Sequence, residues 1–210
     1  MRLRTFGLAA LMSVAALAGG QAQEKTVMVG GAAMYPSKDI IDNAVNSKDH
    51  TTLVAAVKAA GLVDTLKGAG PFTVFAPTNA AFEKLPAGTV EALLKPENKD
   101  KLKTILTYHV VAGTLDAEAL MERVKTGGGK AELTTVSGDK LWVVASGDRL
   151  QLRDEKGHMA AISTPDVYQS NGVIHVINTV VMPSRSSVER SAAESVVSPN
   201  ADPALRPADA

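Results

Sequence analysis

The sequence contains no cysteine, no long basic run and no apolar run of about 20 residues, the length that a membrane-spanning helix needs. Because none of the 210 residues is Cys, disulfides and a nucleophilic Cys are excluded. The fold must therefore be stabilised by an ordinary hydrophobic core.

Charges of the two signs are balanced, with 22 basic and 22 acidic residues. Without Arg2 and Arg4, 20 basic residues remain against 22 acidic ones. No long basic run is left, so neither nucleic acid nor an anionic membrane surface is an expected partner. The lysine-rich stretch over 95–103 is expected to be solvated helix surface.

Catalytic motifs are also missing. The stretch GGGK at 127–130 resembles a phosphate-binding loop, but Ala131 follows the lysine and Val124 stands where the first glycine is required. We interpret it as a flexible loop. There is no G-x-S-x-G and no H-E-x-x-H. No two of the histidines His50, His109, His158 and His175 stand at zinc-ligand spacing from each other, although a site assembled from distant histidines remains an alternative. We therefore expect no cofactor, no metal and no enzymatic activity.

The first residues, MRLRTFGLAALMSVAALAGGQAQ, predict export from the cytoplasm. Two arginines precede an apolar stretch from Phe6 to Ala18, and small residues follow, as in a secretory signal peptide. The alternative is a membrane anchor, but the stretch is short for a bilayer span. We assign residues 1–22 to a signal peptide, with cleavage after Ala18 or Ala22. The mature protein would reside in the periplasm or outside the cell, and would not be an integral membrane protein.

The remaining chain divides into three parts. Residues 23–35 are assigned to a short leader and residues 36–183 to one folded domain. Residues 184–210 contain three prolines and no aromatic residue. Such a segment buries too little apolar surface to offset the entropy of ordering it, so we predict a disordered tail.

The first half of the domain is predicted to be mostly helical. Ser37 is a candidate N-cap for the helix in KDIIDNAVN, and Gly61 is a C-terminal stop for the helix in TTLVAAVKAAG. FTVFA at 72–76 is typical of a strand with apolar side chains on both faces. The other predicted helices are NAAFEKL, which ends before Pro86, then TVEALL and NKDKLKTILTYH.

The second half is predicted to consist of strands. Short stretches (AELTTV, KLWVVA, RLQLR and HMAAIS) are separated by the turn sequences SGDK, SGDR and DEKG, which indicate a four-stranded antiparallel meander. The last strand, GVIHVI, follows Asn171-Gly172, a pair suited to positive φ. Helices first and strands later indicate an α+β domain rather than alternating βαβ units.

Two histidines lie within apolar strand-like stretches. His175 is flanked by aliphatic residues in VIHVI, and His109 precedes Val110 and Val111. Each could be a base or a ligand. We favour a neutral histidine that is hydrogen-bonded to a backbone carbonyl or hydroxyl, because buried polar groups are usually satisfied.

Three segments resemble, in order and spacing, those that define the fasciclin domain: TVFAPTNAAF (73–82), YHVVAGTL (108–115) and NGVIHVINTVVMP (171–183). The resemblance covers residues 36–183 and is nearest to single-domain secreted bacterial members. It implies an α+β fold, a β-wedge or sandwich with helices packed on one side, in which the first and last segments are central strands. Residues with a structural role are then Thr78, Asn79, Asn171, Gly172, His175 and Asn178.

The same resemblance implies adhesion or protein interaction without catalysis, with a protein or polysaccharide of the cell surface or matrix as partner. The resemblance assigns partner binding to seven residues: Tyr108, His109, Val110, Val111, Leu115, Asp166 and Val167. The chain departs from the family pattern at Ala112, Asn178 and Val167. His109 and Asp166 could instead support the conformation. An alternative function is a periplasmic binding module that holds a small or lipid ligand between helices and sheet.

Overall fold

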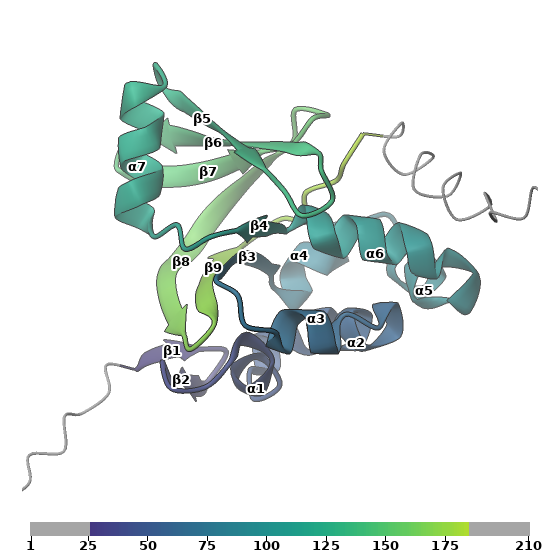
Figure 1. Cartoon of the computed structure of the whole chain (residues 1–210). Helices are drawn as coiled ribbons and strands as arrows, with labels where there is room; N and C mark the ends of the chain where they lie inside the picture. The colour runs from purple at the N-terminus through teal and green to yellow at the C-terminus, as the bar shows by residue number, and fades with distance from the viewer. Residues whose placement is uncertain (1–25, 185–210) are drawn as a thin grey trace, which may run out of the picture.

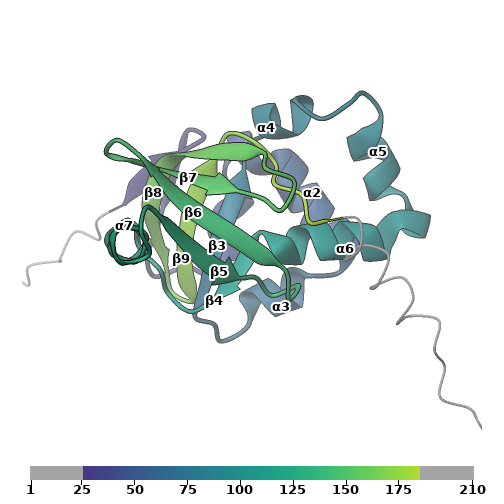
Figure 2. The same ribbon diagram turned by 90° about the horizontal axis from the view of Figure 1, so that it is seen from above.

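The computed structural model describes residues 26–184. The signal peptide predicted over 1–22 and nearly all of the tail predicted over 184–210 lie outside the described residues. Figure 1 shows most helices packed on one side of a strongly bent sheet, and Figure 2 shows the same arrangement from above. None of the described helices is long and apolar enough to cross a membrane.

The helices of the first half are short. They are α1 (Ile40–Ala44), α2 (Thr51–Ala60), α3 (Val63–Lys67), α4 (Asn79–Glu83), α5 (Thr89–Leu94) and α6 (Lys99–Tyr108), with single 3₁₀ turns at Lys48–His50 and Pro96–Asn98. A further helix, α7 (Ala117–Thr126), follows β4 (Val110–Ala112) and packs against the meander, apart from the others (Figure 1).

Seven strands form the main sheet in the order β4-β3-β9-β8-β7-β6-β5. The predicted meander is confirmed as β5 (Lys130–Thr134), β6 (Lys140–Ser146), β7 (Arg149–Arg153) and β8 (Met159–Gln169). The other three strands are β3 (Phe72–Pro77), β4 (Val110–Ala112) and β9 (Gly172–Ile177), so the three fasciclin-like segments lie side by side. The sheet bends until it nearly closes, because Val111 bridges Thr135 and the Val136 N–H donates to the Val110 carbonyl at 2.7 Å.

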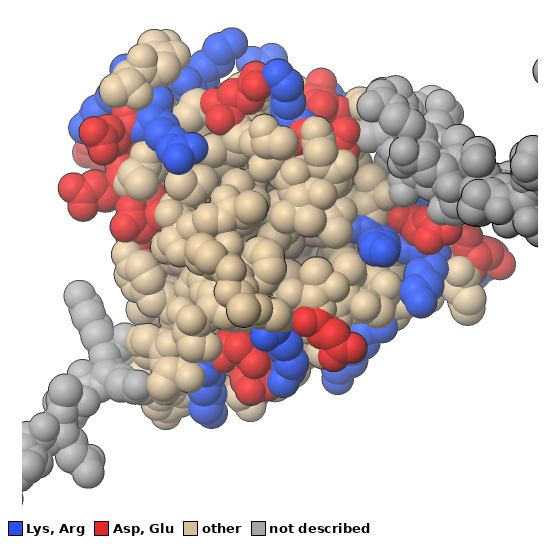
Figure 3. Space-filling model, in the orientation of Figure 1, with Lys and Arg blue, Asp and Glu red and all other residues tan. Residues whose placement is uncertain are grey.

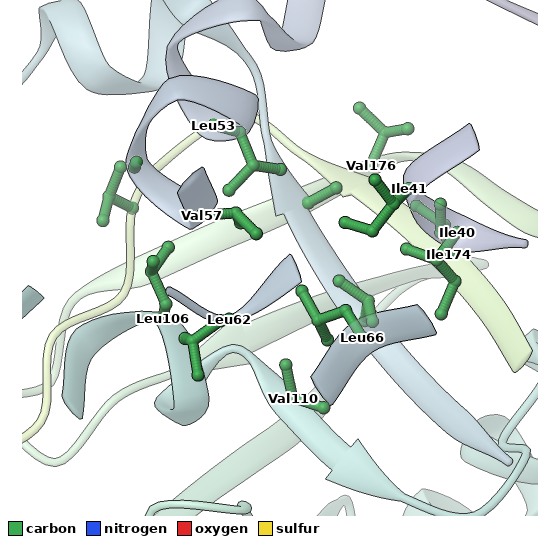
Figure 4. Close-up of a cluster of buried hydrophobic side chains, with 14 of the residues drawn as sticks. Ile40, Ile41, Leu53, Val57, Leu62, Leu66, Leu106, Val110, Ile174 and Val176 are labelled. Atoms are coloured by element: carbon green, nitrogen blue, oxygen red, sulfur yellow. The ribbon is translucent and has the colours of Figure 1, made fainter. Parts of the chain in front are cut away.

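Two hydrophobic cores share this sheet. The helix-side core lies between α1–α6 and strands β3, β4 and β9, and Figure 4 shows its aliphatic side chains pointing toward one another. The meander core lies inside the bend, where Leu120 and Val124 of α7 meet the inward-facing residues of β5–β8. Strand β4 serves both cores, because Val110 belongs to the first and Val111 to the second.

The corner between β3 and α4 joins three elements. Thr78 caps α4, with its side chain accepting from the Ala81 N–H at 3.3 Å. The Asn79 side chain reaches α2 instead, where it accepts from the Thr52 N–H at 3.0 Å and donates to the Lys48 carbonyl at 2.8 Å. The two polar residues therefore satisfy helix ends on both sides of the corner.

Two local predictions were wrong. The N-cap of α1 is Asp39, whose carboxylate accepts from the Asp42 N–H at 2.8 Å, and not Ser37. Neither Asn171 nor Gly172 has a positive φ. Asn171 instead binds the helices, accepting from the Ile40 N–H and donating to the Leu66 and Gly68 carbonyls.

The segment assigned to a leader contains a hairpin that packs on the domain. Strands β1 (Val27–Val29) and β2 (Ala32–Met34) pair antiparallel around Gly30 and Gly31, which both have positive φ. The side chains of Val29 and Met34 are buried in the helix-side core. Within the described residues, the folded unit therefore begins at this hairpin.

Candidate functional site

The seven residues to which the resemblance assigns partner binding lie mostly inside the domain. Asp166 is half-buried. The other six are at most 7% exposed: Tyr108, His109, Val110, Val111, Leu115 and Val167. A partner that approaches this folded domain therefore meets their exposed neighbours first.

His109 ends α6 and is held by backbone groups on both sides of its ring. Nδ1 lies 2.8 Å from the Ile105 carbonyl, which can only accept, so Nδ1 carries the proton. Nε2 then accepts from the Val181 N–H at 3.3 Å. Burial lowers the pKa of His109 to about 4, so the ring is neutral near pH 7.

His175, in the centre of β9, is fixed in the same way with the opposite tautomer. Its Nε2–H donates to the Leu115 carbonyl at 2.7 Å, and its Nδ1 accepts from the Asp166 N–H at 3.3 Å. The ring also stacks on Phe75, with centroids 5.6 Å apart. Burial lowers the pKa of His175 as well. The sequence placed both histidines in strand-like stretches, but only His175 lies in a strand, whereas His109 follows the last turn of α6. Both are neutral and bound to backbone groups.

Asp166 forms an irregular point on β8. It is the single described non-glycine residue with positive φ, at 57°, and the register between β8 and β9 shifts beside it. Its carboxylate accepts from the Ala117 N–H at 2.7 Å, at the start of α7. Asp166 thus joins β8, His175 and α7.

Tyr108 is fully buried in the meander core, and its hydroxyl donates to the Lys140 carbonyl at 2.7 Å. Burial raises the pKa of this hydroxyl, so it stays protonated. The loop after β4 is tied to β3 by Thr73, whose hydroxyl donates to the Gly113 carbonyl and accepts from the Leu115 N–H. These bonds fix the shape of residues 113–117.

The exposed surface above this network is largely uncharged. Figure 3 shows a broad front face without charged side chains over β4 and its neighbours, with Lys, Arg, Asp and Glu gathered at the edges. Ala112 at the end of β4 and Thr114 in the loop after it are exposed, and Tyr168 of β8 is 45% exposed. The Tyr168 hydroxyl lies 3.5 Å from an Asp116 carboxylate oxygen. Interface centres are depleted of charge, so such a face suits contact with another macromolecule.

We expect Asp166→Ala to lower the free energy of unfolding by about 2 kcal/mol. The variant loses the hydrogen bond to the Ala117 N–H, and alanine has no polar side chain that could stabilise a positive φ. Asp166→Asn should stay within about 0.5 kcal/mol, because Asn tolerates this conformation and keeps an acceptor. Urea unfolding at pH 7 measures both. Equal losses for the two variants would contradict the assigned role of the side chain.

Between the helices and the sheet lies an apolar cavity of about 40 Å³. The side chains of Leu53, Val57, Ile174 and Val176 line it (Figure 4), and His50 borders it. Nδ1 of His50 bonds the Ser47 hydroxyl at 2.9 Å, while its buried Nε2 makes no hydrogen bond of ordinary geometry to any residue in 26–184. This volume has room for no more than a few water molecules, so an acyl chain would require the helices to move away from the sheet.

Sequence reasoning missed one element that shapes the site. Helix α7 was not predicted, although Asp116 is an N-cap and Leu120 and Val124 are four residues apart, as on one helix face.

Residues 26–184 contain no group of three or more His, Asp or Glu side chains arranged to hold a metal ion.

Comparison with known proteins matches this arrangement to one family. The fasciclin domain model matches residues 48–183. The chain belongs to the fasciclin domain family. Fasciclin domain proteins are in general adhesion and surface proteins rather than enzymes.

Relatives of known sequence extend the match. Protein sll1483 of Synechocystis is 45% identical over 177 residues, which cover 84% of this chain and 91% of that protein. The cell surface glycolipoprotein MPB83 of Mycobacterium bovis is 37% identical over 160 residues, covering 74% of this chain and 64% of that protein. The transforming growth factor-beta-induced protein ig-h3 of Sus scrofa is 38% identical over 148 residues, but only 20% of it is covered.

A solved structure supports the fold. A FAS1 domain pair from the insect cell adhesion molecule Fasciclin I superposes with a TM-score of 0.64 at 19% identity, covering 73% of this chain and 53% of that chain. The predicted α+β fasciclin fold is thereby confirmed.

Proposed function

We propose that this fasciclin domain is exported and acts without catalysis as a recognition module of the cell envelope or extracellular matrix. The partner is a protein or polysaccharide at the cell surface. The observation that carries the proposal is the uncharged face over β4, whose underlying loop is locked by Thr73, His175 and Asp166. A locked loop loses little conformational entropy on binding, which favours recognition.

The predicted binding residues then divide between support and contact. We assign the buried side chains of Tyr108, His109 and Leu115 to support, together with Val110, Val111 and Val167. We assign direct contact with the partner to three exposed neighbours, Ala112, Thr114 and Tyr168. Export brings this face to the periplasm or the cell exterior. Names of two related proteins, the cell surface glycolipoprotein MPB83 and the cell adhesion molecule Fasciclin I, support this location.

Thr114→Arg tests this assignment, because it places a charge on the exposed face without disturbing the core. The chain is immobilised and incubated with envelope and exopolysaccharide fractions of the producing cells, and the retained components are quantified. We expect Thr114→Arg to reduce retention at least about tenfold, since a buried unpaired charge is costly at an interface. The matched control is Thr126→Arg, which changes an exposed threonine at the end of α7.

Equal retention by the two variants, or no retained component from any fraction, would contradict the proposal. The variant Asp166→Asn tests whether Asp166 supports the loop or contacts the partner directly. If Asp166 only supports the loop, this variant retains the partner as the parent chain does.

A small ligand in the helix-side cavity is the second candidate. It is favoured by the apolar space beside the buried Nε2 of His50, which makes no hydrogen bond of ordinary geometry within residues 26–184. Native mass spectrometry of protein purified from its own compartment tests it, and a bare polypeptide mass would exclude a retained ligand.

A further inference from the structure

An apolar groove of about 530 Å³ lies where three parts of the domain that are distant in sequence meet. It is lined by α4 with the residues after it, by the start of β8 with the turn before it, and by the segment after β9. Figure 2 shows α4 beside the segment that follows β9. The volume lies within the range of about 300–1,000 Å³ that is typical of small-molecule sites.

Most of the side chains that line this groove are apolar, and several of them are in contact with water. Met159 is 43% exposed, and Leu85 and Met182 are half-buried. The apolar lining consists of six residues: Ala81, Leu85, Pro86, Met159, Val180 and Met182. Because covering exposed apolar surface is favourable, this lining suits an occupant with an apolar body.

Two lysines from different elements border the groove. The Lys84 ammonium, just after α4, donates to the Asn178 carbonyl at 2.6 Å and to the Thr179 hydroxyl at 3.4 Å, which leaves one of its three N–H groups for a ligand. Lys156 is exposed on the turn between β7 and β8. Neither lysine forms an ion pair with a carboxylate within residues 26–184.

Among the described residues, no Asp or Glu lines the groove. Asp154 lies in the turn before β8, but it is 1% exposed, and its carboxylate accepts from the His158 ring and from backbone N–H groups, including that of Met182. The Glu155 carboxylate accepts from the Ser184 N–H at 2.9 Å and does not line the groove. An anion in the groove therefore meets ammonium groups and no carboxylate.

We infer that this groove, the Met159 groove, binds a free fatty acid. The acyl chain lies against the apolar lining, and the carboxylate pairs with the ammonium groups of Lys84 and Lys156. Charge-assisted hydrogen bonds of this kind are about twice as strong as neutral ones.

The scarcity of polar groups in the groove favours an acyl chain over an extended peptide. Besides the two lysines, only Thr179 and His158 bring polar side chains to the lining. An extended peptide would place many of its N–H and C=O groups against apolar side chains without hydrogen-bond partners, which is costly. An acyl chain has polar atoms only at one end. The Met159 groove shares no residue with the uncharged face over β4 or with the helix-side cavity, so this inference does not depend on the proposed function.

Methionine methyl groups report on the groove directly, because Met159 and Met182 line it. The full-length chain is labelled with ¹³C at its methionine methyl groups and titrated with decanoate, and NMR spectra follow each methyl group. We expect saturable shifts of Met159 and Met182. Met121 lines a separate groove between α7 and the β7–β8 strands, so it should not shift and serves as the internal control.

Decyltrimethylammonium tests the charge preference, because it carries the same apolar chain with the opposite charge. We expect it to bind at least about tenfold more weakly than decanoate. From hexanoate to decanoate, affinity should rise by about two- to fourfold for each added methylene. Equal affinity for the cation, or a shift of Met121 as large as that of Met159, would overturn the inference.

Variants then locate the contacts, with the Met182 methyl group as the readout. Lys84→Gln and Lys156→Gln should each weaken decanoate binding by about three- to tenfold, because each removes an ammonium partner of the carboxylate. The matched control is Lys101→Gln, an exposed charge loss on α6, and a loss of affinity in this control equal to that of Lys84→Gln would mean unspecific charge attraction and contradict the groove.

Met159→Glu places a carboxylate in the groove and should weaken decanoate binding at least about tenfold. Its control is Met28→Glu, at a residue that is 63% exposed and lies outside the groove. Circular dichroism and thermal unfolding show that each variant retains the fold. Equal affinities of these two variants for decanoate would overturn the assignment.

Two further probes separate a free fatty acid from other occupants. If Met159 and Met182 shift with phosphatidylglycerol vesicles and not with decanoate, the groove contacts a membrane surface and the inference is wrong. If an acidic, leucine-rich helical peptide shifts both methyl groups at a lower concentration than decanoate does, the occupant is a protein partner and the inference is likewise wrong.

Discussion

Gly172→Ala is expected to lower the free energy of unfolding by at least about 4 kcal/mol, and the variant should fail to fold at 37 °C. An added Cβ would lie 2.0 Å from the Phe72 carbonyl oxygen and 2.9 Å from its carbon. These atoms belong to the backbone of β3, which pairs in parallel with β9 at the centre of the sheet. Neither strand can move without disturbing both cores, so overpacking cannot be relieved locally. Urea unfolding followed by circular dichroism measures the loss.

Gly138→Ala is the matched control. Gly138 has a φ of 88°, but nothing lies within 4 Å of an added Cβ, so this change should be limited to backbone strain of about 1–2 kcal/mol. A loss for Gly172→Ala no larger than this would mean that close approach to β3 is not the reason for glycine at 172.

Acidification is expected to destabilise the domain by about 3 kcal/mol through His109 alone. The pKa of its imidazole is lowered to about 4 in the folded chain by burial, against an unfolded value of 6.5. The unfolded chain therefore binds the proton more readily, so the stability due to neutral His109 is complete above pH 6.5 and is lost as the pH falls toward 4. Protonation of Nε2 would also set two N–H groups against each other, because Nε2 accepts from Val181. His175 contributes in the same direction.

Urea unfolding at pH 7, 5.5 and 4 measures this loss. Residue 109 cannot titrate in His109→Gln, so the free energy of unfolding of this variant should fall by about 3 kcal/mol less over the same pH range than that of the parent chain. Carboxylates contribute equally to both chains, so their contribution cancels in this comparison. Titration of the His109 ring near pH 6.5 in the folded protein, followed by NMR, would contradict the prediction.

Sequence reasoning succeeded where local chemistry and global fold agree. The turn sequences SGDK, SGDR and DEKG indicated the meander, and Gly61 ends α2 in the left-handed conformation, as predicted. His175 is neutral and bound to a carbonyl, although its partner, Leu115, lies 60 residues away and no local pattern could name it.

It failed where a residue acts over distance. Asn171-Gly172 was interpreted as a pair suited to positive φ, and Asn171 does lie in the turn between β8 and β9, but neither residue has a positive φ. The structure uses the Asn171 side chain to hold α1 and α3, and uses the missing Cβ of Gly172 for the approach of β3.

The parallel pairing of β3 with β9 has a consequence for how the polypeptide acquires its structure. Phe72 pairs with Gly172, so the middle of the sheet joins residues 100 positions apart. Helices α1–α4 lie against strands that are incomplete until the last part of the domain has been synthesised. Such distant pairing slows folding. A ribosome-bound or truncated chain that stops before residue 172 therefore keeps an unfinished sheet with its apolar surface open to water.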